Sequence, residues 1–140
     1  SLNHIGLLAI EMFLTQDNKV LINEIAQRPH NSGHHTIECC YTSQFEQHLR
    51  SILNLPLGDT SIKIPGIMLN LVGENKVEGD VVYENMEKVM RFTGVTPHIY
   101  GKRKSRLNRK MGHITIVNKN IDDAIEMSKE IKKIIKVTTK

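Results

Sequence analysis

The stretch VLINEIAQRPHNSGHH, residues 20–35, runs from an apolar strand directly into a cluster of acidic, basic, amide and imidazole side chains. Residues 20–26 have the length and the β-branched content of a strand. The turn-forming residues QDNK at 16–19 separate this strand from an earlier apolar run at residues 5–14. The two runs predict a β-hairpin, whose first strand is apolar enough to be buried on both faces.

Two glutamates, Glu11 and Glu24, lie in the middle of these predicted strands. A four-residue turn at 16–19 places them directly opposite each other on one face, with Cβ atoms roughly 4.5–5.5 Å apart. A five-residue turn would instead place Glu11 opposite Asn23 and rotate Glu24 to the other face. Opposed carboxylates favour a cation between them, and their oxygens suit Mg²⁺. Two unrelated, solvated glutamates remain the alternative.

The polar cluster that follows the second strand predicts an anion site. Arg28 offers a planar donor fork, while His30 and Asn31 add a titratable ring and an amide. Residues 32–33, Ser-Gly, allow backbone N–H groups to face an anion at the start of a helix through residue 38. A polar turn with an N-cap explains the same residues equally well.

Metal and thiol chemistry are weaker hypotheses for the next segment. Four ligands within seven residues of one helix cannot all converge on one tetrahedral zinc ion. A nucleophilic thiolate needs a base and an electropositive pocket, which the sequence does not secure. Ordinary packing is the simpler interpretation of this group, which consists of His34, His35, Cys39 and Cys40.

The net charge of +4 over 140 residues comes from one loop. Residues 102–110 hold six of the 19 basic side chains, which leaves 13 basic against 15 acidic residues elsewhere. Such a loop suits one anionic ligand better than a nucleic acid. Arg109 and Lys110, before a glycine and a strand, are the best candidates for a fixed role, and a solvated loop is the alternative for the rest.

Composition also restricts the class of protein. No apolar run reaches the length of a membrane span, and the first residues lack the features of a signal peptide. Two adjacent cysteines form no disulfide framework, which is typical of a reducing cytosol. We therefore expect a cytoplasmic protein without a membrane or nucleic-acid partner.

Strands and helices alternate irregularly, which predicts an α+β fold. Ser43 with Glu46 forms a capping box for a helix, and LPLGD at 55–59 marks a boundary between domains 1–57 and 58–140. Beyond that boundary the expected strands are 67–72, 97–100 and 113–117, and the expected helices are 84–92 and an amphipathic C-terminal helix capped by Asn120.

Several motifs together closely resemble those of the N5-carboxyaminoimidazole ribonucleotide synthases, a family of ATP-grasp enzymes in purine biosynthesis. The resemblance covers residues 6–117, and RPHNSGH and SQFEQHLR are its most specific parts. The motifs are AIEMF at 9–13, NEIAQRPHNSGHHTIE at 23–38, TSQFEQHLRSILNLPLG at 42–58, YGK at 100–102 and RKMGHITI at 109–116.

This resemblance implies an ATP- and Mg²⁺-dependent ligase that joins bicarbonate to the amine of 5-aminoimidazole ribonucleotide, through carboxyphosphate, with release of ADP and phosphate. Residues 1–57 would be the closing segment of an ATP-grasp domain. Residues 58–140 would be a small hybrid-motif-like domain, a mixed β-sheet or barrel with a C-terminal helix. The full-length enzyme would be a homodimer.

The resemblance also implies site residues. Glu11 and Glu24 match the acidic pair that holds Mg²⁺, and Asn23 with Glu24 matches the nucleotide-binding positions. Catalytic roles fall on Arg28, His30 and Asn31 at the bicarbonate side and on Lys102. Substrate-binding roles, toward the ribonucleotide and its 5′-phosphate, fall on Lys102, Arg109 and Lys110. Gln27 and Asn108 depart from the family pattern, where proline and glycine are usual.

Two other functions remain open. One is a different ATP-grasp carboxylase or ligase, such as a formate-dependent purine enzyme or biotin carboxylase. The other is a non-catalytic module that binds an anion. Because the family chain is far longer, we expect an N-terminal domain and a central ATP-grasp lobe before Ser1, and little or no activity from residues 1–140 alone.

Overall fold

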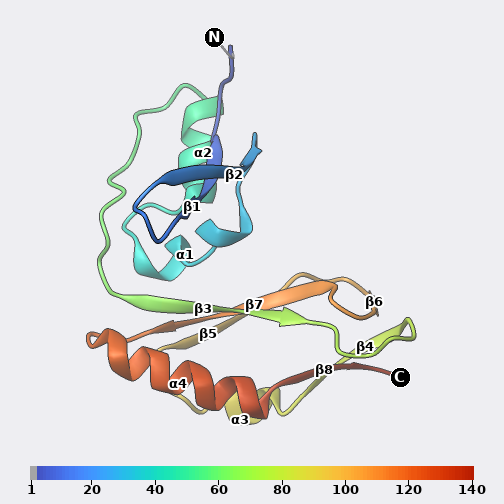
Figure 1. Cartoon of the computed structure of the whole chain (residues 1–140). Helices are drawn as coiled ribbons and strands as arrows, with labels where there is room; N and C mark the ends of the chain where they lie inside the picture. The colour runs from blue at the N-terminus through green and yellow to red at the C-terminus, as the bar shows by residue number, and fades with distance from the viewer. Residues whose placement is uncertain (1–2) are drawn as a thin grey trace. The chain divides into compact units, whose positions relative to one another are not determined.

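The computed structural model describes residues 3–140, which form two compact units that divide between Lys63 and Ile64 (Figure 1). The division lies six residues after the boundary expected at residue 57. Residues 58–63 stay with the first unit because they bond back to it. The Lys63 N–H donates to the Cys39 carbonyl at 2.8 Å, and Gly58 bonds the Gln47 side chain through both of its backbone groups.

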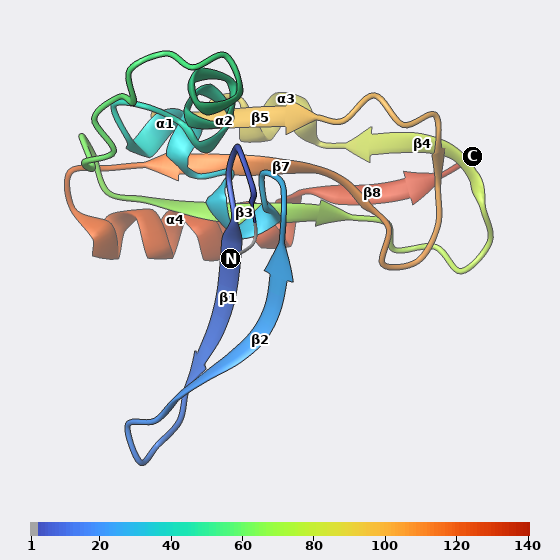
Figure 2. The same cartoon turned by 90° about the horizontal axis from the view of Figure 1, so that it is seen from above.

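The first unit opens with the hairpin of β1 (Ala9–Leu14) and β2 (Val20–Ala26), which Figure 2 shows as two long antiparallel strands. The expectation that the first strand is buried on both faces is wrong for this chain. Phe13 is 56% exposed and Leu14 is 72% exposed, since the hairpin is a two-stranded sheet. The strand also begins at Ala9, four residues later than expected.

The hairpin register combines a longer turn with a bulge. Leu14 pairs with Val20, so the turn has five residues and not four. The register then shifts between Glu11 and Met12, and Asn23 becomes the extra residue on β2. As a result Glu11 lies opposite Glu24, as predicted, although the turn length used to predict it was wrong.

Short helices complete the first unit. The helix expected from residue 31 is divided into a 3₁₀ turn, η1 (Asn31–Gly33), and α1 (Thr36–Cys39). The next helix, α2 (Gln44–Ile52), begins where expected, since the Ser43 side chain accepts a hydrogen bond from the Glu46 N–H at 3.2 Å.

The second unit contains two three-stranded antiparallel sheets and two helices, α3 (Met86–Val89) and α4 (Ile121–Ile134) (Figure 1). The α+β class is thus confirmed. One sheet has the order β3-β7-β5 and the other β6-β4-β8. The strands are β3 (Gly66–Val72), β4 (Gly79–Glu84), β5 (Val95–Ile99), β6 (Lys104–Ser105), β7 (Lys110–Val117) and β8 (Lys136–Thr139).

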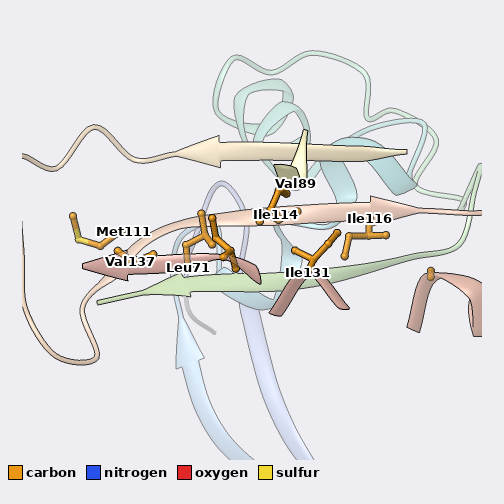
Figure 3. Close-up of a cluster of buried hydrophobic side chains, with 9 residues drawn as sticks. Leu71, Val89, Met111, Ile114, Ile116, Ile131 and Val137 are labelled. Carbon is orange, nitrogen blue, oxygen red and sulfur yellow. The ribbon is translucent and has the colours of Figure 1, made fainter. Parts of the chain in front are cut away.

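The core of the second unit lies where α4 packs on β3 and β7 (Figure 3). Ile114 and Ile116, two residues apart on β7, present one face to it, and the apolar stripe of α4 covers them. The fully or nearly fully buried side chains of this core are Leu71, Val89, Met111, Ile114, Ile116, Ala124, Ile131, Ile135 and Val137.

The expected helix at 84–92 is shortened to its middle four residues, with turns on either side. Its first residue ends β4, Asn85 has a left-handed φ of 61°, and α3 itself spans four residues. The C-terminal helix begins after the Asn120 cap as expected but ends at Ile134, because the residues after it pair with β4. No described helix is long and apolar enough to cross a membrane.

Asn108, which stands where the family usually has glycine, has a left-handed φ of 62°. Asparagine is the residue that best tolerates this region after glycine. Its N–H also donates to the Gly73 carbonyl at 2.8 Å, which fixes the turn before β7. The departure from the family pattern therefore preserves the backbone shape.

Replacing Ile131 with alanine removes a fully buried side chain from the core. We expect Ile131→Ala to lower the free energy of unfolding by about 2–5 kcal/mol. Ile121→Ala, on the same helix at a residue 40% exposed, is the matched control and should cost less than about 1 kcal/mol. Urea titration followed by circular dichroism measures both; equal losses would contradict the core assignment.

At position 108, we expect Asn108→Gly to leave stability nearly unchanged, because glycine adopts a left-handed φ readily. Asn108→Ala should cost about 1 kcal/mol, since its Cβ disfavours that conformation. Thermal unfolding of the two variants tests the point. An alanine variant as stable as the glycine variant would show that the turn relaxes to another conformation.

Candidate functional site

Two carboxylates and one imidazole gather beside the hairpin. One ligand atom from each of Glu11, Glu24 and His30 lies within 4.8 Å of the other two. The His30 Nε2 is 2.6 Å from Glu24 Oε1, and the Asn23 amide donates to Glu11 Oε1. The bulge that contains Asn23 therefore supplies a donor to one carboxylate, and the following loop supplies a donor to the other.

The His30 ring is held from both sides. It is buried, with 11% of its side chain exposed, although Glu24 is 55% exposed. The Ser32 N–H donates to His30 Nδ1, and the Ser32 hydroxyl lies 2.7 Å from the same nitrogen. Because a backbone N–H can only donate, Nδ1 accepts and Nε2 carries the proton that faces Glu24.

This donor set fits Mg²⁺ through its carboxylates. Magnesium prefers oxygen ligands and is commonly held by one or two carboxylates together with substrate phosphates. Imidazole is a more usual ligand of transition metals. Since His30 Nε2–H already donates to Glu24, the geometry favours Glu11 and Glu24 as ligands, with His30 orienting one of them.

The other residues of the predicted anion cluster lie next to this group along the chain. Arg28 is exposed, and its Nη1 donates to the Pro29 carbonyl at 3.0 Å. A guanidinium has five N–H donors, so this bond leaves most of the fork for an anion. Asn31 is half-buried at the start of η1.

Zinc and thiol chemistry receive no support from the geometry. Across residues 3–140, Glu11, Glu24 and His30 form the one group of three or more possible ligands that comes together. Cys39 and Cys40 are both buried. Burial, with smaller effects from Cys40 and Glu38, raises the pKa of the Cys39 thiol, which disfavours a thiolate nucleophile or ligand.

The basic loop, residues 102–110, belongs to the second unit and is ordered by its own contacts. Lys102 Nζ donates to the Lys110 carbonyl at 2.7 Å and lies 5.7 Å from the centre of the Tyr100 ring. Arg109 Nη1 donates to the Lys104 carbonyl at 3.0 Å. The first bond joins Lys102 to Lys110, two of the residues that the sequence singles out, and the second holds the third, Arg109, to the backbone of the same loop.

Asp80 on β4 anchors the same loop by charge. Its carboxylate lies 3.2 Å from Lys104 Nζ and 3.7 Å from the Arg103 Nε. Both cations are thereby partly neutralised, whereas Lys102 and Arg109 bond backbone carbonyls and keep their charge for a ligand. Arg103 and Lys104 therefore have a structural partner in Asp80, and Lys102 and Arg109 are the better candidates for binding an anion.

Sequence reasoning missed two residues that support the predicted ones. Tyr100 places its ring under Lys102 and its hydroxyl 2.9 Å from His113 Nδ1. Gln44, the first residue of α2, bonds the backbone of His30 twice. Both lie in motifs that carry the family resemblance, YGK and SQFEQHLR, and that was the available signal.

Both units are similar to domains of known protein families. The ATP-grasp domain family matches residues 1–45, and the phosphoribosylaminoimidazole carboxylase C-terminal domain family matches residues 66–127. The curated N5-carboxyaminoimidazole ribonucleotide synthase of Bacillus subtilis is 48% identical over 125 residues, which are 89% of this chain and 31% of that protein.

Solved structures of the same enzyme family have a similar fold over most of this chain. The crystal structure of N5-carboxyaminoimidazole ribonucleotide synthetase from Thermotoga maritima superposes with a TM-score of 0.90 at 49% identity, over 97% of this chain and 38% of that one. A synthase from Aspergillus clavatus, in complex with ADP and 5-aminoimidazole ribonucleotide, has a TM-score of 0.79 at 36% identity, over 91% and 34%.

The chain spans about a third of the length of these bacterial and fungal synthases. The two family matches include the hairpin and the polar cluster, within residues 1–45, and the basic loop, within residues 66–127. The chain belongs to the family of N5-carboxyaminoimidazole ribonucleotide synthases.

Proposed function

We propose that the protein to which this chain belongs is an ATP-dependent ligase that carboxylates 5-aminoimidazole ribonucleotide with bicarbonate. The products are N5-carboxyaminoimidazole ribonucleotide, ADP and phosphate. The observation that carries the proposal is the grouping of Glu11, Glu24 and His30 on the ATP-grasp portion of a chain from this family.

Glu11 and Glu24 would hold Mg²⁺, with Asn23 beside them. The metal would supply positive charge to neutralise the charge that develops on the transferred phosphoryl group. The chain's own contribution is to fix the two carboxylates. Asn23 restrains Glu11, and His30 restrains Glu24, by the hydrogen bonds described above.

Arg28, His30 and Asn31 form the bicarbonate side of the site. The Arg28 fork binds the anion and directs one oxygen toward the γ-phosphoryl group; a P–O bond forms to bicarbonate as the bond to ADP breaks. The substrate amine then attacks the carboxyl carbon of carboxyphosphate, the bond from that carbon to the phosphate oxygen breaks, and the leaving phosphate takes up the proton that the amine loses. His30 Nε2–H stays on Glu24 during these steps and keeps that ligand oriented.

Lys102, Arg109 and Lys110 bind 5-aminoimidazole ribonucleotide, and Lys102 also acts in catalysis. Support comes from the ordered basic loop and from the Aspergillus clavatus structure, which contains that ribonucleotide with ADP. Three cations around a 5′-phosphate give the charge match that such a ligand needs.

The complete enzyme, in this proposal, is a cytoplasmic homodimer that binds neither nucleic acid nor a membrane. A different ATP-grasp ligase, or a non-catalytic anion-binding module, are the alternatives. The acceptor that triggers ADP release distinguishes the proposed enzyme from a different ATP-grasp ligase. Absence of any acceptor-dependent ADP release would support the non-catalytic module. Salt-dependent binding of DNA or RNA to residues 102–110 would contradict the exclusion of nucleic acid.

Replacing Glu24 with glutamine removes one metal ligand but keeps the size of the side chain. In the complete synthase we expect Glu24→Gln to reduce kcat by more than about 100-fold. Release of ADP with both bicarbonate and the ribonucleotide present is the measurement. Glu126→Gln, an exposed carboxylate on α4, is the control and should stay within twofold, about the error of such assays. Near-normal turnover of Glu24→Gln would mean that the metal site is misassigned.

Residues 1–140 alone should show no bicarbonate- and ribonucleotide-dependent ADP release. The chain spans only about a third of the length of the synthases it matches, and an ATP-grasp site draws on more of the domain than the 45 residues matched here. The assay compares this chain with the complete synthase at equal concentration. ADP release by the 140-residue chain that depends on bicarbonate and the ribonucleotide would overturn this expectation.

A further inference from the structure

We propose that Gln44 is a positioning residue, which holds His30 and through it the Glu24 carboxylate in the geometry of the site. The proposal rests on the function proposed above. Gln44 is the first residue of α2, and it is buried, with only 8% of its surface exposed.

The side-chain amide of Gln44 bonds both backbone groups of His30. Its Oε1 accepts from the His30 N–H at 2.9 Å, and its Nε2 donates to the His30 carbonyl at 2.8 Å. Two antiparallel bonds to one residue fix its position much as pairing with a neighbouring strand would. The polar loop after β2 thereby gains a rigid attachment to α2.

The surroundings of this amide are built to fit it. Gln44 Nε2 also lies 2.8 Å from His34 Nδ1, and the Gln44 backbone N–H donates to the Thr36 hydroxyl at 2.9 Å. A Cβ on Gly33 would lie 2.5 Å from Gln44 Oε1. A side chain at position 33 would collide with this amide, which explains the glycine there. The contact also packs the two motifs RPHNSGH and SQFEQHLR against each other.

The consequence for the site follows from the loop. His30 has an extended backbone, with φ −112° and ψ 150°, outside any regular strand or helix. Its ring nevertheless reaches Glu24 at 2.6 Å. Because Gln44 fixes the His30 backbone, it sets the direction from which the ring meets the carboxylate. Gln44 touches neither carboxylate itself, so its effect on catalysis is indirect.

Gln47, one turn later on α2, supplies a matched control. Its Nε2 donates to the Gly58 carbonyl at 2.7 Å, and its Oε1 accepts from the Gly58 N–H at 3.0 Å. It thus makes the same pair of bonds to a single backbone residue, but away from the proposed site residues. A purely structural role would make the two glutamines equivalent.

The first experiment compares Gln44→Met with Gln47→Met in the complete synthase. Methionine keeps the length of the side chain and removes both hydrogen bonds. We expect Gln44→Met to lower kcat about 10- to 100-fold, with KM for 5-aminoimidazole ribonucleotide unchanged, while Gln47→Met stays within about twofold. Equal effects of the two variants on kcat would overturn the proposal.

The second experiment uses the 140-residue chain and needs no activity. Nitrogen-15 spectra of the imidazoles report which ring nitrogen of His30 carries the proton. The expected change is a shift of the His30 signals in Gln44→Met and none in Gln47→Met; unchanged His30 signals in both would contradict the proposal. If the wild-type synthase fails to carboxylate its ribonucleotide, the proposed function fails while this readout still tests Gln44.

Gly33→Ala provides a second route if Gln44→Met does not fold. The added methyl group displaces the amide from His30 without removing it. The His30 signals should shift in the same direction as in Gln44→Met, with a smaller fall in kcat. Wild-type signals and wild-type kcat in Gly33→Ala would show that the amide does not position the ring.

Discussion

The repulsion between two carboxylates that face each other across neighbouring strands is the constraint on which the first unit depends. Glu11 and Glu24 are opposed in the hairpin, an arrangement that is unfavourable without compensation. Asn23 donates to one and His30 to the other, and a divalent cation between them would remove the remaining repulsion. Gln44 then matters because it fixes the residue that supplies the second donor.

The sequence predicted the pairing of the glutamates, but through two compensating errors. Apolar and β-branched content located both strands, whereas turn length and the bulge depend on local backbone geometry that this content does not encode. The burial of β1 was also overestimated. An apolar run shows that a strand has hydrophobic faces, not that the described residues cover them, and Leu14 stays largely exposed.

In the second unit, prediction succeeded where the signal was local. Asn120 caps α4 by accepting a hydrogen bond from the Asp122 N–H, and the amphipathic pattern predicted a helix whose apolar side, including Ile131, packs in the core. It failed for β4, β6 and β8, which form through pairing between segments far apart in sequence. Gln44 was missed for the same reason, since its partner lies 14 residues earlier along the chain.

The most direct test of the account is paramagnetic broadening of the His30 imidazole by Mn²⁺, a substitute for Mg²⁺, in the 140-residue chain labelled with nitrogen-15 histidine. This measurement detects weak binding, because the ion exchanges rapidly between molecules. A cation held by Glu11 and Glu24 should broaden the His30 signal at substoichiometric Mn²⁺, and the double variant Glu11→Gln/Glu24→Gln should abolish the effect. A His30 signal that stays sharp in the wild type, or broadens equally in the double variant, would contradict the proposed metal site.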